Sequence, residues 1–110
     1  MSELRSIFIT GAAAGIGRAT ARHFARRDWF VGLHDIDGAG LAQLADELRA
    51  VHGAPTVTTG ELDVTDPDQF NDAVQAFLAV SGGRLDVLFN NAGILKMGNF
   101  DQVDPALQRK

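Results

Sequence analysis

Short apolar segments alternate along this 110-residue chain with longer segments of helical periodicity, and this alternation restricts the fold more than any other feature. Four short segments, rich in β-branched, aromatic or continuously apolar residues, are predicted to be strands: 6–10, 29–35, 56–62 and 85–90. Helices are predicted between them. The order β-α-β-α-β-α-β predicts an α/β fold of right-handed βαβ units, with helices on both faces of a parallel sheet.

Each of the three predicted helices carries an apolar stripe at helical spacing. We expect these stripes to face the sheet. Their members are Ile16, Thr20, His23, Phe24 and Arg27 in the first helix, Leu41, Leu44, Ala45, Leu48 and Val51 in the second, and Phe70, Val74, Phe77 and Leu78 in the third.

The ends of the third helix are marked by local signals. Asp66 is predicted to be the N-cap, with Pro67 in the first helical position and Gln69 as the capping-box partner. The pair at 82–83, both glycine, is predicted to end the helix. A further start signal, Asp-Pro at 104–105, predicts one more helix that has only begun where the sequence ends.

Composition excludes several classes of function. The net charge of −4 disfavours nucleic acid and anionic membranes as main partners. The sequence has no cysteine, which rules out disulfides and thiolate metal sites, and its three histidines share no ligand spacing, so no metal site is predicted. No apolar run approaches the ~18 residues of a membrane span, and the N-terminus lacks the layout of a signal peptide. We therefore expect a cytoplasmic protein.

The first predicted strand runs into a loop with almost no side chains, FITGAAAGIG at 8–17. Its glycines, Gly11, Gly15 and Gly17, lie where a helix N-terminus offers unpaired N–H groups and a positive dipole end to an anion. The alanines at 12–14, Ala14 included, keep that approach clear. The spacing is not that of a P-loop. A loop of this kind can also serve only a backbone turn or the packing of helix on strand, and both interpretations stay open.

Asp35 ends the second predicted strand, 18 residues after Gly17. A carboxylate at about this distance accepts hydrogen bonds from an adenosine ribose in dinucleotide-binding folds. The alternative is a turn or cap residue. Because a carboxylate repels a 2′-phosphate, and no lysine or arginine occurs in 12–16 or 36–40, NAD is favoured over NADP.

Together these segments resemble the short-chain dehydrogenase/reductase family along the whole chain. Residues 10–17 match its T-G-x-x-x-G-I/L-G motif, and 90–93 match its N-N-A-G motif at the end of the fourth predicted strand. The segments 62–66 (LDVTD) and 85–88 (LDVL) resemble two further family segments in the expected order. The resemblance implies a Rossmann-type sheet, truncated after the fourth strand and the start of the next helix.

The resemblance also implies a role for each matching residue around a dinucleotide cofactor. In the family, the glycine loop surrounds the pyrophosphate and the nearby ribose of the cofactor. The ends of the second and third strands bind the adenosine of the cofactor, and backbone atoms after the fourth strand face the middle of the dinucleotide. Asn91 is expected to be structural. The residues carried over are Gly11, Gly15, Ile16 and Gly17 for the first group, Asp35, Ile36, Asp63 and Val64 for the second, and Asn90, Ala92 and Gly93 for the third.

Enzymes of this family transfer a hydride between NAD(P) and an alcohol or carbonyl substrate, using a Ser and a Tyr-x-x-x-Lys pair that lie beyond these motifs. The sequence contains no tyrosine, so no catalytic residue is predicted in it and the chain alone is expected to be inactive. Residues 1–110 are therefore expected to form a partial NAD(P)-binding domain, in an enzyme that can form homo-oligomers. The alternatives are a non-catalytic nucleotide-binding module and an inactive truncated fragment.

Overall fold

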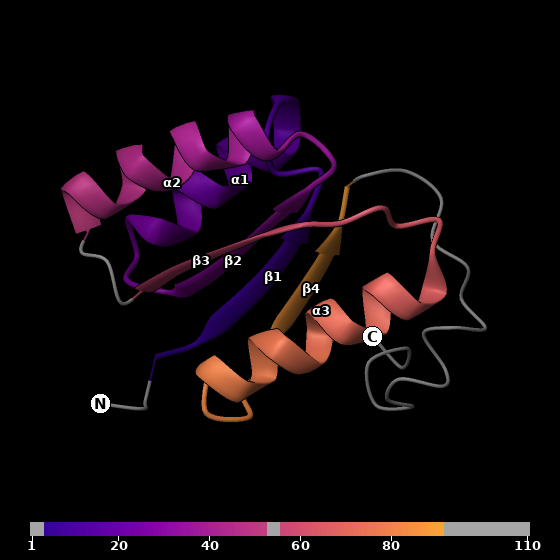
Figure 1. Ribbon diagram of the computed structural model, residues 1–110. Helices are drawn as coiled ribbons and strands as arrows, with labels where there is room; N and C mark the ends of the chain where they lie inside the picture. Colours follow the sequence, from indigo (N-terminus) through magenta and orange to yellow (C-terminus); the bar gives the residue numbers. More distant parts are fainter. Residues whose placement is uncertain (1–3, 53–55, 92–110) are drawn as a thin grey trace.

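The computed structural model describes residues 4–52 and 56–91. Strands and helices alternate in the predicted order, and the strands form one parallel sheet in the order β3-β2-β1-β4 (Figure 1). The α/β fold predicted from the sequence is thereby confirmed. The elements are β1 (Ser6–Thr10), α1 (Gly15–Ala25), β2 (Phe30–Asp35), α2 (Gly38–His52), β3 (Val57–Glu61), α3 (Pro67–Val80) and β4 (Val87–Asn90).

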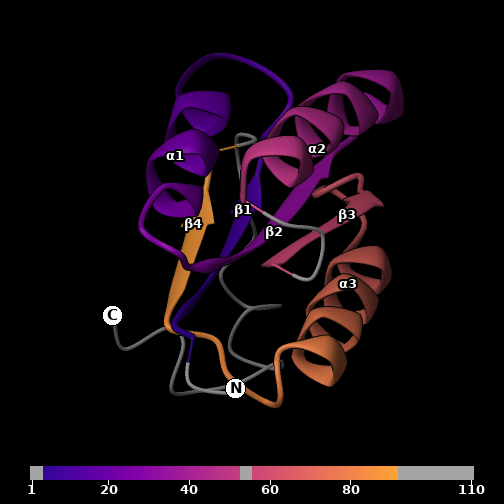
Figure 2. The same cartoon turned by 90° about the vertical axis from the view of Figure 1, so that its left-hand side faces the viewer.

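The helices form two layers, with α1 and α2 on one face of the sheet and α3 on the other (Figures 1 and 2). Successive residues of β1 point to opposite faces: Ile7 and Ile9 pack in the cluster under α1 and α2, whereas Phe8 packs in the cluster under α3. Every residue of β1 is buried, as expected for a central strand covered on both faces. A buried central strand therefore leads directly into the glycine loop.

The predicted stripe of α1 is confirmed only at Phe24, which packs against the cluster under α1 and α2. The buried residues of this helix are Gly17, Ala21 and Ala25, while Ile16 is 68% exposed. Small side chains let the helix lie close to the sheet, so its fully buried positions, 17, 21 and 25, lie one residue after the predicted positions 16, 20 and 24. In α2 the predicted stripe is confirmed except at Val51. The last α2 residue in the buried cluster is Leu48, and the side chain of Val51, one turn later, is 71% exposed.

The predicted ends of α3 are confirmed with one difference. The carboxylate of Asp66 accepts hydrogen bonds from the N–H groups of Asp68 and Gln69, at 3.0 and 3.3 Å. Gln69, however, does not accept from the Asp66 N–H; its Oε1 accepts from the N–H of Asp63, at 3.1 Å. The Asp66 N–H is already bonded to the Asp63 carbonyl, which is why the capping box does not close. Gly83, with φ 82°, donates to the carbonyl of Leu78 and ends the helix.

Two further predictions from the sequence concern membrane spans and metal sites. Among the helices within 4–52 and 56–91, none is long and apolar enough to cross a membrane. In the same part of the chain, no three histidine or acidic side chains gather in a group able to hold a metal ion. The helix predicted to begin at 104–105 lies outside the described residues.

Candidate functional site

The carboxyl ends of all four strands meet at one edge of the sheet, around a cavity of about 390 Å³. The chain runs outward from β1 through β2 to β3 and then crosses back to β4 on the other side of β1, so the strand order reverses between β1 and β4. A crevice at such a switch point is where open α/β sheets bind ligands. The cavity is lined by Gly11 after β1, Asp35 and Ile36 at the end of β2, Leu62, Asp63, Val64 and Thr65 after β3, and Asn91 after β4.

The glycine loop passes from β1 to α1 through backbone conformations that favour glycine. Gly11 and Gly15 have φ values of 67° and 59°, in the left-handed region. Gly17 is required for a different reason, since a Cβ there would lie 2.8 Å from the carbonyl carbon of Gly11 and 2.9 Å from Nδ2 of Asn91. The first turn of α1 is therefore packed directly against the loop and the end of β4.

The N-terminus of α1 has the properties of an anion site. Its N-cap is Ala14, which offers no side-chain hydrogen bond to the first helical N–H groups, and no acidic residue lies in the first turn. These N–H groups and the helix dipole leave a positive helix end. Arg18 donates to the carbonyl of Ala13, at 3.2 Å, and so braces the loop from the following turn.

Asp35 holds the glycine loop from the end of β2. Its Oδ2 accepts a hydrogen bond from the N–H of Ala13, and its Oδ1 accepts one from the N–H of Asp37, both at 2.9 Å. The neighbouring carbonyl of His34 accepts from the N–H of Ala12, at 3.1 Å. The Asp35 carboxylate therefore holds the loop backbone and lines the cavity at the same time. A structural role in the turn and a role in ligand binding, the two interpretations of Asp35, do not exclude each other.

The ends of β1 and β4 are joined through the hydroxyl of Thr10. This hydroxyl donates to Oδ1 of Asn90, at 2.8 Å, and accepts from the N–H of Asn91, at 2.9 Å. The Asn91 side chain lies 3.4 Å from the Gly11 carbonyl, to which its Nδ2 donates. The asparagine pair therefore ties the last strand to the glycine loop, and Asn91 has the structural contacts expected of it while also lining the cavity.

The loop after β3 forms the far wall of the cavity. Oδ1 of Asp63 accepts from the hydroxyl of Thr65, at 2.6 Å, and from the Thr65 N–H, at 2.9 Å. These two bonds, the hydroxyl's foremost, lower the pKa of Asp63, because they favour the charged carboxylate. The wall therefore carries a fixed negative group beside the apolar side chain of Val64.

The residues singled out in the sequence fall into three groups. Those that line the cavity are Gly11, Asp35, Ile36, Asp63 and Val64. Those that lie beside it on the loop, the start of α1 and the end of β4 are Ala14, Gly15, Ile16, Gly17 and Asn90. Ala92 and Gly93 lie outside the described residues. Sequence reasoning assigned no role to Thr10 or Thr65, although a threonine two residues after an aspartate is a recognisable turn signal.

Comparison with known proteins identifies relatives over nearly the whole chain. Residues 5–109 match the sequence model of a family described as short chain dehydrogenase. A 1-deoxy-11-beta-hydroxypentalenate dehydrogenase of Streptomyces arenae is 40% identical over 97 residues, 86% of this chain and 32% of the relative. A 3-oxoacyl-acyl-carrier-protein reductase of Thermotoga maritima is 42% identical over 94 residues, 86% of this chain and 37% of the relative. The chain thus spans about a third of the length of these curated relatives.

Solved structures share the fold as well, and two of them serve as examples. A short chain dehydrogenase/reductase from Burkholderia phymatum in complex with NAD superposes with a TM-score of 0.77 at 35% identity, covering 83% of this chain and 31% of that one. The L-sorbose reductase of Gluconobacter frateurii, complexed with NADPH and L-sorbose, superposes with a TM-score of 0.72 at 33% identity, covering 83% and 34%.

Proposed function

The chain belongs to the short-chain dehydrogenase/reductase family, and we propose that it supplies the NAD-binding part of an oxidoreductase acting on an alcohol or carbonyl substrate. In this proposal residues 1–110 form the dinucleotide-binding domain. The bound cofactor supplies or accepts the hydride. The observation that carries the proposal is the cavity at the carboxyl ends of the strands, next to a helix N-terminus that has no side-chain cap.

The adenosine part of the cofactor fits the cavity on chemical grounds. Ile36 is 72% exposed and lines the cavity, so burial of its side chain against an adenine ring removes apolar surface from water. Val64 lines the same cavity, and the carboxylate of Asp63 is an acceptor suited to the adenine amino group. The pyrophosphate is placed at the N-terminus of α1, where N–H groups and the helix dipole favour an anion.

Asp35 is proposed to select NAD. Each of its oxygens accepts one backbone hydrogen bond, and each retains lone-pair capacity for a ribose hydroxyl. A 2′-phosphate in the same place meets a carboxylate that the loop backbone holds in position, and no lysine or arginine is present in 36–40 to neutralise it. One structural neighbour was solved with NAD and another with NADPH, so the family accommodates both cofactors and the choice depends on local residues.

The 110 residues hold the cofactor without completing the chemistry. The sequence has no tyrosine, so a tyrosine general acid–base has to come from residues outside it. We therefore expect the chain to bind the dinucleotide and to show no turnover with alcohols or carbonyls.

Isothermal titration calorimetry tests the proposal. The chain is titrated with NAD, with NADP and with S-adenosylmethionine, which serves as a ligand of a different sheet-binding class. We expect NAD to bind, NADP to bind about tenfold more weakly, and S-adenosylmethionine not to bind.

The variant Asp35→Ala is expected to weaken NAD binding about tenfold and to narrow the difference between NAD and NADP. Asp46→Asn is the matched control, because Asp46 is an exposed carboxylate on α2 away from the cavity. Equal binding of both cofactors by the unaltered chain contradicts the role of Asp35, and no binding of either contradicts the proposed function.

A further inference from the structure

Ala13, in the middle of the glycine loop, is held on both sides of its backbone. Its N–H donates to Oδ2 of Asp35, at 2.9 Å, and its carbonyl accepts from Nη1 of Arg18, at 3.2 Å. Its methyl group lies against the first turn of α2, because a Cβ on Gly40 would lie 3.0 Å from the Cβ of Ala13. The next residue, Ala14, is exposed and is the N-cap of α1. The course of the chain into the first turn of α1 therefore depends on how Ala13 is held.

Arg18 reaches the loop from the first turn of α1. Side chains of a helix lean toward its N-terminus, so a long side chain at this position lies back over the loop. The neighbouring helix α2 lies beside α1 on the same face of the sheet (Figures 1 and 2). From this helix, Oε1 of Glu47 lies 3.7 Å from Nη2 of Arg18. The guanidinium is thus placed between a loop carbonyl and a carboxylate on the neighbouring helix.

Glu47 is itself held by Arg22, one turn after Arg18 on α1. The Arg22 guanidinium donates to both carboxylate oxygens of Glu47, at 2.7 and 2.8 Å, which is the bidentate geometry that arginine and carboxylate favour. These hydrogen bonds, and less strongly the charges of Arg22 and Arg18, lower the pKa of Glu47, so its carboxylate is charged near pH 7. A fixed negative charge on α2 therefore faces the Arg18 guanidinium and restricts its orientation.

This network lies outside the cavity at the strand ends, since neither Arg18 nor Glu47 is among the described residues that line it. The side chains of Arg18, Arg22 and Glu47 are between 24% and 40% exposed, and ion pairs of this kind contribute little to stability. The main consequence that we expect is the position of the loop. Backbone N–H groups bind an anion more tightly when they are already held in the binding geometry, because less conformational freedom is lost on binding.

We propose that Arg18, oriented by Glu47, is a positioning residue for the dinucleotide. It holds the glycine loop so that the N–H groups at the start of α1 meet the pyrophosphate. An ion pair between α1 and α2 thereby sets the affinity for the cofactor from outside the cavity. This inference rests on the proposed dinucleotide site, and it adds a residue of α2 to the glycine loop and the strand ends.

Isothermal titration calorimetry with NAD compares the unaltered chain with variants of the ion pair. Arg18→Met keeps the aliphatic stem and removes the donors, and NAD is expected to bind about fivefold more weakly. Arg18→Lys restores a charge and a donor for the Ala13 carbonyl and is expected to recover the affinity to within about twofold. Glu47→Gln is expected to weaken NAD binding about twofold in the unaltered chain. It is expected to have no effect in the Arg18→Met background, because it acts through Arg18.

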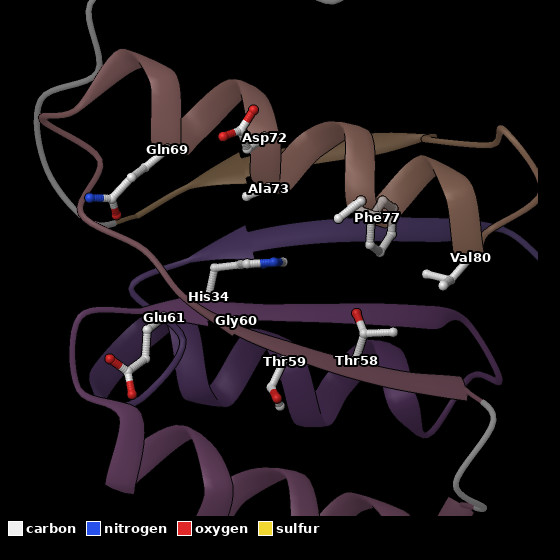
Figure 3. Close-up of a pocket in the computed structure, with 11 residues that line it drawn as sticks. His34, Thr58, Thr59, Gly60, Glu61, Gln69, Asp72, Ala73, Phe77 and Val80 are labelled. Atoms are coloured by element: carbon white, nitrogen blue, oxygen red, sulfur yellow. The ribbon is translucent and has the colours of Figure 1, made fainter.

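Adenosine separates positioning of the loop from general distortion of the site, because it has the adenosine part of the cofactor without the pyrophosphate. Its dissociation constant, measured from amide shifts of the 15N-labelled chain, is expected to be the same in Arg18→Met as in the unaltered chain. Asp72→Asn is the matched control for Glu47→Gln, because it removes an exposed carboxylate from α3, on the opposite face of the sheet. Figure 3 shows Asp72 beside a separate cavity between β3 and α3, and its substitution is expected to leave the NAD affinity unchanged.

The outcomes distinguish this inference from the proposed function. Absence of NAD binding by the unaltered chain contradicts both. If the unaltered chain binds NAD, the inference alone is overturned by an unchanged NAD affinity in Arg18→Met, by an equal loss of adenosine binding, by no recovery in Arg18→Lys, or by a full effect of Glu47→Gln in the Arg18→Met background. Urea unfolding checks that each variant is folded. Should Arg18→Met not fold, equal NAD affinities of Glu47→Gln and Asp72→Asn overturn the inference instead.

Discussion

The buried imidazole of His34 makes the stability of the fold depend on pH in a defined window. Its pKa falls from 6.5 to about 4 in the folded chain, chiefly because burial disfavours the charged ring. The unfolded chain therefore binds a proton more readily than the folded chain between these values. The stability contributed by the neutral ring is present above pH 6.5 and is lost as the pH falls toward 4.

The size of this effect follows from the two pKa values. Each tenfold difference in acidity corresponds to about 1.4 kcal/mol, so the full difference is about 3 kcal/mol once the pH lies below both values. At pH 5 the unfolded histidine is mostly protonated and the folded one mostly neutral. Between pH 7 and pH 5 the free energy of unfolding is expected to fall by about 2 kcal/mol. The carboxylates of Glu47 and Asp86, whose pKa values lie below their ordinary 4.5 and 3.8, contribute to loss of stability only at lower pH.

Urea unfolding followed by the fluorescence of Trp29 measures this directly. Trp29 is the one tryptophan of the chain and packs against the buried cluster under α1 and α2. The variant His34→Leu stays neutral at every pH and is expected to lose much less stability than the unaltered chain over the same interval. If both proteins lose the same amount between pH 7 and pH 5, the reasoning about the buried ring is refuted.

Four substitutions test the local structure by the same unfolding measurement. Gly17→Ala is expected to lower the free energy of unfolding by about 2 kcal/mol or more, because the new Cβ meets the Gly11 backbone. At Gly15 a Cβ meets nothing within 4 Å, so Gly15→Ala is expected to cost only the roughly 1 kcal/mol of its left-handed φ. Equal losses of stability in the two variants argue against the close packing at Gly17. Asp66→Ala is expected to cost about 1 kcal/mol through the lost N-cap of α3, and an unchanged midpoint contradicts that cap. Thr10→Val is expected to cost about 1–3 kcal/mol, because it removes the two bonds that the Thr10 hydroxyl makes with Oδ1 of Asn90 and the N–H of Asn91. An unchanged free energy of unfolding contradicts the importance of these two bonds.

The sequence predicts the family and the order of elements because both are encoded in contiguous stretches. The match over residues 5–109 confirms the resemblance inferred from the motifs at 10–17 and 90–93. The N-cap at Asp66 is likewise a local signal, and it is found where it was predicted. Such features depend on residues at most a few positions apart, so a single sequence is enough to locate them.

Other features depend on which segments meet in space. The helix α1 packs through Gly17 and Ala21, whose small size gives no hydrophobic signal, while the more apolar Ile16 remains exposed. The bond from the Ala13 N–H to Asp35 joins residues 22 positions apart, and no spacing rule indicates it. The tie between Thr10 and Asn90 spans 80 positions and becomes visible only when β1 and β4 are seen to pair.

The location of the bound cofactor tests the central claim most directly. Amide shifts of the 15N-labelled chain are recorded during titration with NAD. We predict that the perturbed amides cluster at 11–17, 35–37 and 62–65, around the cavity at the strand ends, while those of 73–80 stay unchanged. Perturbations centred on α3, or spread over the surface without saturation, would contradict the assignment of the glycine loop and its cavity as the dinucleotide site.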